Sequence, residues 1–481
     1  MASLADIQGD IVVGLSKETE LFFFFEILDV TAFRSQITDL IPLITTAEQA
    51  QKGRSDIRAF KAKQRKLATD GDEETSDPGT LPVVGVNIAF SAKGIEKMEV
   101  TGSDNIGDEI FNAGMIKDAK NLGDKEKLPQ QPEYQPEWNE IFLQEIHGVI
   151  LITGDTHHAV YTKLDEVKTI LTKENTSVVR EIATLVGDVR PGDQRGHEHF
   201  GYKDGISQPA IDGIDAISSP GQSKVDQGVV LVGRGGDDDA NTRPSWALDG
   251  SFLAFRKLLQ KVPEFNQFLV DKAPSVGDPT ANVADLLGAR LVGRWKSGAP
   301  VTEAPLRDDV DLGNDPQRNN DFTFIKGNQQ SCPFAAHVRK MNPRGDLSES
   351  TIKPRLVARR GIPFGCEVTE EEKHTGKTQH ERGLYFVCYQ SNLAKGFNFL
   401  QKSWANEVGF PPFTPQVPGQ DAIIGQTIHE DVRTVTGFDK DSLTQGLPLT
   451  AQWVTSENGG GEYFFSPSLP SLRNTFACSH T

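Results

Sequence analysis

The chain lacks the features that mark several large classes of protein. It has only four cysteines among 481 residues, and no two of them have the C-x-x-C spacing, which excludes a disulfide scaffold. Acidic residues outnumber basic ones by 67 to 50, and the net charge of −17 excludes binding to nucleic acid through its phosphate backbone. No apolar run approaches the roughly 20 residues of a membrane-spanning helix, so we expect no membrane insertion.

The pattern of apolar segments predicts the same order of strands and helices in both halves of the chain. In the first half we expect strands at 21–29, 82–90, 145–153 and 178–188, and helices at 31–51 and 156–173. This β-α-β-β-α-β order is that of a ferredoxin-like unit. The second half repeats it more loosely, with strands at 251–256, 355–360 and 383–390 and helices at 258–272 and 392–406. The charged segment 53–79 predicts a long exposed loop.

Three segments stand out for their chemistry, and the first is Glu198-His-Phe-Gly-Tyr-Lys-Asp-Gly-Ile-Ser-Gln-Pro209. It places Asp204 directly before Gly205, a dipeptide that on its own is a common turn former. The second is Ser331-Cys-Pro-Phe-Ala-Ala-His-Val-Arg-Lys-Met-Asn-Pro-Arg344, which predicts a short helix with His337 near its middle. Two alanines before His337 would leave space around its ring.

The third segment is Arg355-Leu-Val-Ala-Arg-Arg-Gly-Ile-Pro-Phe-Gly365. Successive side chains of a strand point to opposite faces, so Arg359 and Arg360 cannot face the same pocket. The apolar run at 383–390 predicts a buried strand in which Leu384 and Phe386 share one face.

Taken in this order, the three segments resemble motifs of the fungal dye-decolorizing peroxidases. Other similar segments lie at 7–11, 249–252, 287–295 and 419–426, so the resemblance covers nearly the whole chain. It implies an α+β fold in which two ferredoxin-like units form a dimeric α+β barrel. We expect an N-terminal unit at 1–225, which carries Asp204, and a C-terminal haem-binding unit at 226–481.

The resemblance also implies one haem b per chain and a peroxidase that reduces hydrogen peroxide and oxidises dyes, phenols and lignin-related aromatics by one-electron steps. His337 would bind the haem iron. Asp204 would transfer a proton between the peroxide oxygens, and Arg359 would stabilise the developing negative charge. Leu384 and Phe386 would form an apolar lid beside this pair.

Other residues are candidates to support the haem or its ligand. Asp421 is expected to accept the second ring N–H of His337. Arg339 and His199 are candidates to contact a haem propionate. Cys332 is the weaker alternative as the iron ligand, because thiolate ligation would predict a chemistry closer to that of monooxygenases.

Bulky dyes need an electron-transfer site at the surface, and Trp404 is the candidate for it. Polar residues at 402, 403, 406 and 407 predict an exposed indole, whereas the alternative is ordinary helix packing. Mn²⁺ is a further candidate substrate, because the carboxylate pairs Asp212 with Asp215 and Asp346 with Glu349 offer the oxygen ligands that hard cations favour.

Two other functions remain open at this point. A non-enzymatic haem-binding or iron-delivery protein of the same fold would keep His337 but need neither Asp204 nor Arg359, and a haem-free interaction module would need none of the three. The first 20 residues lack the pattern of a signal peptide. We therefore expect either the mature form of a secreted protein, as fungal relatives frequently are, or an intracellular one.

Overall fold

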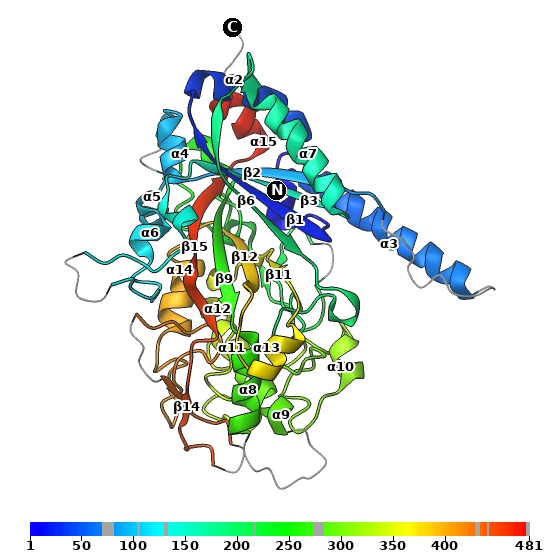
Figure 1. Cartoon of the computed structure of the whole chain (residues 1–481), viewed down its shortest axis with the longest axis vertical. Helices are drawn as coiled ribbons and strands as arrows, with labels where there is room; N and C mark the ends of the chain where they lie inside the picture. Colours follow the sequence, from blue (N-terminus) through cyan, green and yellow to red (C-terminus); the bar gives the residue numbers. More distant parts are fainter. Residues whose placement is uncertain are drawn as a thin grey trace.

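The structure is a computed structural model of the whole chain, shown in Figure 1. The residues that it describes are 1–69, 81–102, 106–128, 133–215, 218–273, 283–428, 433–439 and 442–477. Within these residues, nine strands form one large sheet, in which β11 pairs with β12 beside the path β10-β12-β9-β15-β2-β3-β1-β6.

The N-terminal half has the predicted β-α-β-β-α-β order. Its elements are β1 (Thr19–Ile27), α2 (Val30–Leu40), β2 (Gly85–Phe90), β3 (Gly148–Gly154), α7 (His157–Ile170) and β6 (Val179–Asp188). Strand β1 pairs antiparallel with both β3 and β6. The sequence therefore predicted the order of elements in this half correctly. Most ends are shifted by a few residues, but the helix expected at 31–51 ends at Leu40, and a second helix begins at Ala47.

The C-terminal half contains a strand that the sequence pattern did not reveal. Most expected elements are present as β9 (Ser251–Gln260), α8 (Val262–Lys272), β10 (Ala358–Arg359), β11 (Ile362–Gly365) and β12 (Arg382–Gln390). The helix expected at 392–406 is shorter and consists of α14 (Phe397–Phe399) followed by a π-helical segment, Leu400–Ala405. The missed strand, β15 (Val454–Ser466), pairs with β9 along most of its length and meets β2 at Phe465 and Phe90. It thereby joins the sheets of the two halves into one sheet.

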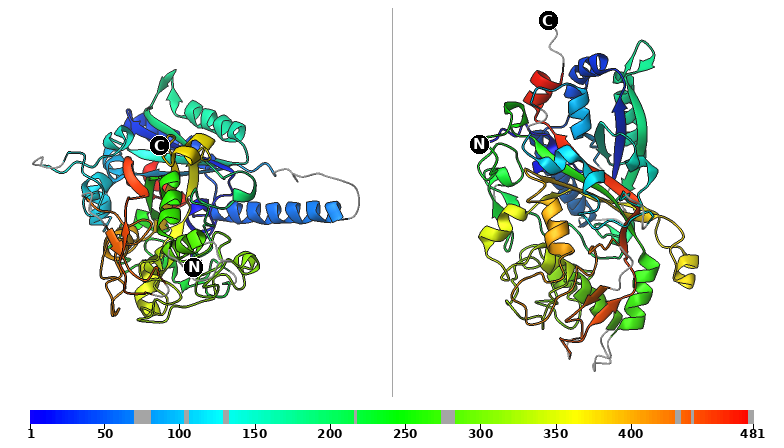
Figure 2. Two further views of the ribbon diagram at one scale, coloured as in Figure 1. Left: turned by 60° about the horizontal axis from the view of Figure 1, so that its bottom comes forward. Right: turned by 90° about the vertical axis from the view of Figure 1, so that its left-hand side faces the viewer.

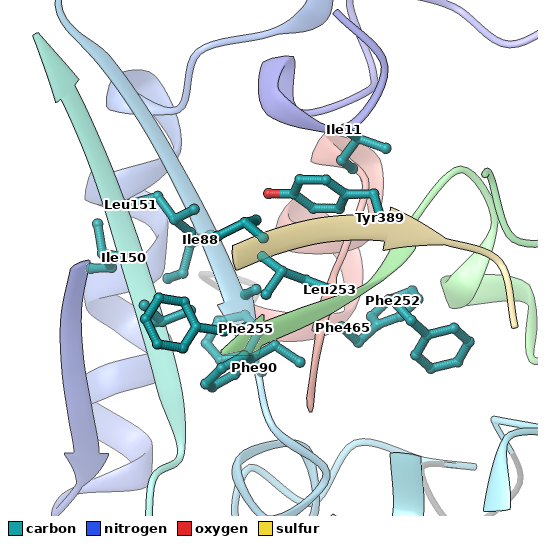
Figure 3. Close-up of a cluster of buried hydrophobic side chains, with 14 of the residues drawn as sticks. Ile11, Ile88, Phe90, Ile150, Leu151, Phe252, Leu253, Phe255, Tyr389 and Phe465 are labelled. Atoms are coloured by element: carbon teal, nitrogen blue, oxygen red, sulfur yellow. The ribbon is translucent and has the colours of Figure 1, made fainter. Parts of the chain in front are cut away.

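The strands curl so that side chains of the two halves pack against each other. Phe22 of β1 contacts Phe255 of β9 and Tyr385 of β12, with ring centroids 4.9 Å and 5.5 Å apart. Phe23 lies on the opposite face of β1, under Lys168 of α7. Because strand side chains alternate, β1 is apolar on both faces, one facing the barrel interior and the other facing helices. Figure 3 shows part of this buried cluster, to which β2, β3, β9 and β15 contribute.

The prediction of a loop at 53–79 was wrong over 53–69, and residues 70–80 lie outside the described part. Residues 47–69 form the long helix α3 (Ala47–Thr69), which projects from the body of the protein in Figure 2. The segment is charged but rich in alanine, lysine, glutamine and arginine, which are strong helix formers. Helix α3 is too polar to cross a membrane, and no other described helix is long and apolar enough to do so.

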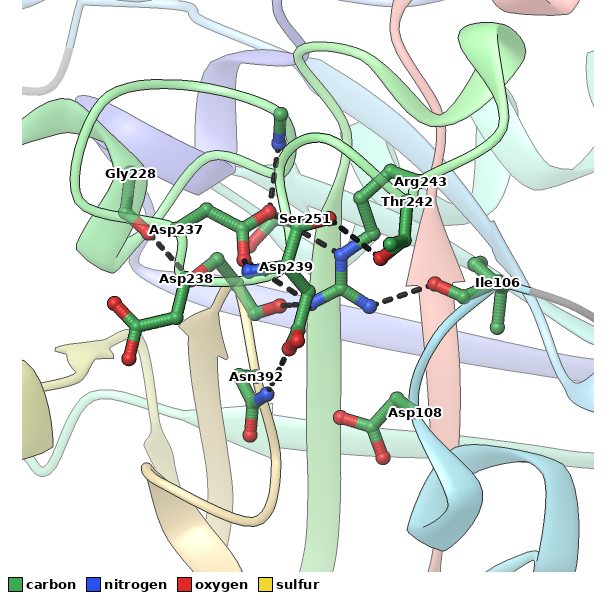
Figure 4. A network of polar contacts seen from close by, with 12 residues as sticks. Ile106, Asp108, Gly228, Asp237, Asp238, Asp239, Thr242, Arg243, Ser251 and Asn392 are labelled. Carbon is green, nitrogen blue, oxygen red and sulfur yellow. Dashed lines mark hydrogen bonds and ion pairs between the residues drawn. The ribbon is translucent and has the colours of Figure 1, made fainter.

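A buried arginine ties loops of the two halves together, as Figure 4 shows. Arg243 forms an ion pair with Asp237 and donates hydrogen bonds to the carbonyl oxygens of Ile106 (2.6 Å) and Ser391 (2.8 Å). The loop around Ile106 belongs to the N-terminal half, whereas the other two groups belong to the C-terminal half. These contacts hold the two halves together in addition to the main-chain hydrogen bonds of the sheet.

We predict that Phe24→Ala destabilises the fold strongly. Phe24 is fully buried, and its ring lies 5.0 Å from that of Phe255 across the barrel. Removing a buried phenylalanine side chain costs about 3–5 kcal/mol, which is measurable by urea unfolding. The control is Phe413→Ala, because Phe413 is 77% exposed and its loss should change the unfolding free energy by about 0.5 kcal/mol at most. Equal effects of the two changes would contradict the barrel packing described here.

Candidate active site

A cavity of about 280 Å³ beside the end of the sheet brings together five of the residues selected from the sequence. They are Asp204, His337, Arg359, Leu384 and Phe386. The first three are separated by up to 155 positions in the chain, and only the fold brings them to one place. Apolar side chains make up much of the remaining wall.

Asp204 and Arg359 form an ion pair at this cavity. Arg359 Nη1 lies 2.7 Å from Asp204 Oδ1, and the same oxygen accepts the main-chain N–H of Gly205 at 2.6 Å. Gly205 has a φ of +79°, so the Asp-Gly pair does form the tight turn that was the simpler interpretation. Removal from bulk water would raise the pKa of Asp204, but Arg359 and the Gly205 amide outweigh this and hold that pKa below its usual range.

The main chain of Arg359 is held by a single side chain from the Asp204 segment. Gln208 accepts the Arg359 N–H at 3.0 Å and donates to the Arg359 carbonyl oxygen at 3.1 Å. Gln208 thus pairs with Arg359 much as a neighbouring strand would. The neighbouring Arg360 points elsewhere and donates to the carbonyl oxygens of Asp10 (2.7 Å) and Ile11 (3.3 Å). Of these two arginines, only Arg359 lines this cavity, as strand alternation predicts.

His337 is oriented by a buried carboxylate. Its Nδ1 lies 2.9 Å from Asp421 Oδ2, and the other oxygen of Asp421 accepts the main-chain N–H groups of Ile423 and Ile424. Burial would lower the pKa of His337, but Asp421 raises it above its usual value. Within the described residues, His337 Nε2 has no hydrogen-bond partner, so this nitrogen is free to bind a group in the cavity.

The helix that carries His337 is shorter than predicted. Helix α11 (His337–Met341) has five residues, and His337 is its first residue rather than a central one. Ala335 and Ala336 are fully buried in two separate core clusters and do not border the cavity. They therefore do not provide the space around the His337 ring that was expected of them. Cys332 is also fully buried, in the same cluster as Ala336, and does not line the cavity.

Strand β12 supplies the apolar side of the cavity. Leu384 and Phe386 both line it, and the ring of Phe386 lies 5.8 Å from that of Phe397. Further apolar lining comes from Leu258, Val338, Leu356, Leu400, Ile423 and Ile424. An apolar cavity with one unpartnered imidazole nitrogen suits a flat, largely apolar cofactor that carries a metal ion.

Two cations of the cavity wall were not selected from the sequence. Arg294 is 4% exposed and donates to the carbonyl oxygens of Gly298 and Asn319. Burial, and then the charges of Arg344 and Arg359, lower its pKa to about 9. Among the described residues it has no carboxylate partner, and Lys203 likewise bonds only to neutral oxygens of Gly313 and Asn314. Both cations could pair with carboxylates of a cofactor such as haem.

The predicted contact of Arg339 with a haem propionate was wrong. Arg339 is 1% exposed, and all five of its N–H groups are used within the protein. Two of them bind Asp346, and the others bind carbonyl oxygens of the loop that precedes α11. His199 is also buried, lies within hydrogen-bond distance of the Phe364 carbonyl oxygen and does not line the cavity. Both residues therefore support loops around the site.

Trp404 is buried, contrary to the prediction of an exposed indole. It is 2% exposed and lies in the π-helical segment Leu400–Ala405. Its ring stacks on Phe410, with centroids 5.0 Å apart and an interplanar angle of 11°. The polar neighbours that suggested exposure lie at other positions around the helix, so they do not report on the face that Trp404 occupies.

The carboxylates considered for Mn²⁺ are occupied by other partners. Asp212 forms an ion pair with Lys224, Asp346 with Arg339, and Glu349 with Lys353. Asp215 accepts the main-chain N–H of Ile211. Across the described ranges, no three His, Cys, Asp or Glu side chains are grouped to hold a metal ion.

The chain is similar to known proteins in both sequence and structure. A family model described as the DyP dimeric alpha+beta barrel domain matches residues 6–191, and one described as Dyp-type peroxidase, C-terminal, matches residues 211–410. The chain is 42% identical to a dye-decolorizing peroxidase of Mycena epipterygia, over 97% of this chain and 86% of that protein.

Solved structures of similar proteins agree with this match. A mutant of the dye-decolorizing peroxidase from Pleurotus ostreatus has a TM-score of 0.91 and 42% identity, covering 99% of this chain and all of that one. A second structure, described as coming from engineering of the heme pocket of a dye-decolorizing peroxidase, has a TM-score of 0.85 and 39% identity over 99% of this chain and 100% of that one.

We predict that Arg359→Leu raises the pKa of Asp204. The guanidinium stabilises the ionised carboxylate, so its removal should raise the pKa of Asp204 from its lowered value toward the usual aspartate range. The measurement is a pH titration of ¹³C-labelled aspartate carboxyl signals by NMR, with Asp204→Asn to assign the resonance. Arg360→Leu removes the same charge from the next residue and is expected to raise this pKa less. A larger rise in that variant would contradict the contacts described above.

Proposed function

The chain belongs to the dye-decolorizing peroxidase family, and on that premise we propose that it binds one haem b and uses hydrogen peroxide to oxidise dyes and phenols by one-electron steps. Reduction of one hydrogen peroxide to two water molecules takes two electrons and two protons. Two donor molecules would each supply one electron. The observation that carries the proposal is the shared cavity of the His337–Asp421 and Asp204–Arg359 pairs.

The residues of the cavity fit haem. His337 would bind the iron through Nε2, because Asp421 occupies Nδ1 and makes the imidazole a stronger electron donor. Arg294 and Lys203 would pair with the propionate carboxylates. When bound, haem supplies the iron centre at which the oxygen–oxygen bond of the peroxide breaks.

Asp204 and Arg359 have different roles in the reaction with hydrogen peroxide. The lowered pKa of Asp204 keeps its carboxylate ionised in mildly acidic solution, so it can take the proton from one peroxide oxygen. It then returns this proton to the other oxygen, which departs as water. Arg359 remains beside it and stabilises the negative charge that develops between the two proton transfers. An iron-delivery protein of the same fold would not need this pair, and its presence favours the peroxidase.

Substrates too large for the cavity require a path for electrons through the protein. We propose that Trp404 is part of this path, inside the protein rather than at its surface. Trp404 stacks on Phe410, which is also buried, so this ring would be the next step of the path. Oxidation of lignin-related aromatics would use the same route. Oxidation of Mn²⁺ remains a prediction. Among the described residues, no group of carboxylates is arranged to bind this ion.

We predict that Asp204→Asn and Arg359→Leu each slow the reaction with hydrogen peroxide about 10²- to 10⁴-fold while haem stays bound. A single acid-base or electrostatic group typically increases a reaction rate by a factor of this size. His337→Ala should lose haem or change the absorption spectrum of the iron. The measurements are stopped-flow absorbance after mixing with peroxide and the ratio of haem to protein.

The control for these variants is Arg473→Leu, since Arg473 is exposed on the helix at 472–476 and does not line the cavity. It should react with peroxide at the rate of the unchanged protein. A loss below threefold for both Asp204→Asn and Arg359→Leu would refute the roles given to them. Full haem content with an unchanged spectrum in His337→Ala would refute its role as the iron ligand.

We predict that Trp404→Phe lowers the turnover of a bulky anthraquinone dye at least tenfold, while the rate of the reaction with peroxide and the oxidation of a small phenol are retained. Phenylalanine keeps the stacking on Phe410 but is much harder to oxidise than tryptophan. Steady-state rates with the two donors provide the comparison. The conservative change separates electron transfer from packing, since Trp404 is buried. Equal losses for both donors would identify Trp404 as a structural residue only.

A further inference from the structure

A second cavity, of about 770 Å³, adjoins the haem cavity on the side of the Asp204–Arg359 pair. Asp204, Gly205, Gln208, Arg359 and Leu384 line both cavities. The other walls of the second cavity come from residues 12–17, from the segments 189–222 and 358–363, and from the first half of α3, where α3 leaves the body of the protein in Figures 1 and 2. It is far larger than hydrogen peroxide needs, and it has the size of a small-molecule site.

Five arginines line this cavity, and Arg359 and Arg360 are both among them, so the expectation that these two cannot face the same pocket holds for the haem cavity but not here. Three of the five have no carboxylate partner within the described residues. They are Arg54 and Arg58, one turn apart on α3, and Arg360, which follows β10. Gly14 makes their approach possible, since a Cβ on this residue would lie 2.8 Å from Arg360 Nε and 2.9 Å from Arg54 Nη2. Partial removal from water, and then the neighbouring charge of Arg360, lower the pKa of Arg54, although its side chain stays accessible to solvent. Two guanidinium groups held this close together favour a shared anion.

The protein does not neutralise these three charges directly. Arg360 donates only to carbonyl oxygens of Asp10, Ile11 and Arg359. Arg54 and Arg58 make no hydrogen bond or ion pair with any residue in the described ranges, and both side chains remain accessible. Unpaired cations gathered in a concave site are unusual on a protein whose net charge is −17.

The other charged groups of the cavity are engaged elsewhere. Glu198 accepts the main-chain N–H groups of Phe200 and Tyr202, and Asp215 accepts that of Ile211. Lys17 is paired with Glu20, and Arg190 with Glu367. Asp204 is paired with Arg359. The charges of Asp215 and of the buried Asp10 do act on Arg54 and Arg360, but neither carboxylate forms an ion pair with them. Three arginines beside two carboxylates leave this side of the cavity with an excess of positive charge.

We propose that the second cavity binds small anionic aromatic electron donors, whose sulfonate or carboxylate group lies against Arg54, Arg58 and Arg360 while the ring reaches toward the haem cavity. This inference rests on the proposed peroxidase function. Each bound donor gives one electron to the enzyme oxidised by peroxide and releases its phenolic proton to water. Guanidinium groups bind both anions through charge-assisted hydrogen bonds.

The test uses the haem-loaded enzyme without peroxide, so that binding is measured apart from turnover. The probes are 4-hydroxybenzenesulfonate, 4-hydroxybenzoate and the neutral 4-hydroxybenzyl alcohol, titrated by calorimetry. The double variant Arg54→Gln, Arg58→Gln should bind both anions at least tenfold more weakly and the neutral probe unchanged. The matched control is Lys52→Gln, because Lys52 is exposed on the same helix and does not line the cavity.

Turnover with peroxide then gives a second readout. The double variant should raise the KM for the sulfonate about tenfold, and the KM for the neutral alcohol and the rate of the reaction with peroxide should stay the same. Equal anion binding by the unchanged protein and the double variant would overturn the proposal. Inorganic sulfate binding as tightly as the aromatic sulfonate would also overturn it, since the site would then recognise only a small anion. Intact anion binding without turnover of any donor would instead refute the proposed function.

Discussion

The pairing of β15 with β9 is the interaction on which the rest of the structure depends. Without it the two ferredoxin-like halves would each present an open sheet edge, β2 on one side and β9 on the other. With it they form one curled sheet whose interior is filled by aromatic rings from both halves. The cavity lies at the end of this sheet, and Val454, the first residue of β15, is part of its wall.

Within this framework, each reactive side chain is positioned by a polar group from a distant segment. Gln208 binds the main chain of Arg359, and the buried Asp421 binds the ring of His337. Asp421 is itself fixed by two main-chain N–H groups. Such supporting contacts determine which nitrogen of the imidazole is free and where the guanidinium points. They limit the motion of groups that must act on a molecule as small as hydrogen peroxide.

Local sequence patterns predicted the parts of the structure that depend on local physics. The alternation of side chains separated Arg359 from Arg360, and the ferredoxin-like order of the first half followed from apolar periodicity. The patterns failed where the structure depends on tertiary packing and not on local sequence. Strand β15 contains Glu457, Asn458 and three consecutive glycines, which weaken any strand pattern. The burial of Trp404 depends on Phe399 and Phe410, which no spacing relates to it. Arg294 lies in the segment 287–295, which resembles the peroxidase family. This resemblance was the signal that could have identified Arg294 as a residue of the site.

The position of β15 in the chain affects the order in which the protein can mature. The residues that line the haem cavity lie between 198 and 454, so nearly all of them leave the ribosome before β15 does. Domains usually fold as synthesis proceeds, with the N-terminal part first. Here the first half can form its own four-stranded sheet early, but its edge at β2 stays open until residues 454–466 have been made. Stable uptake of a cofactor is then expected only after residues 454–466 have been made.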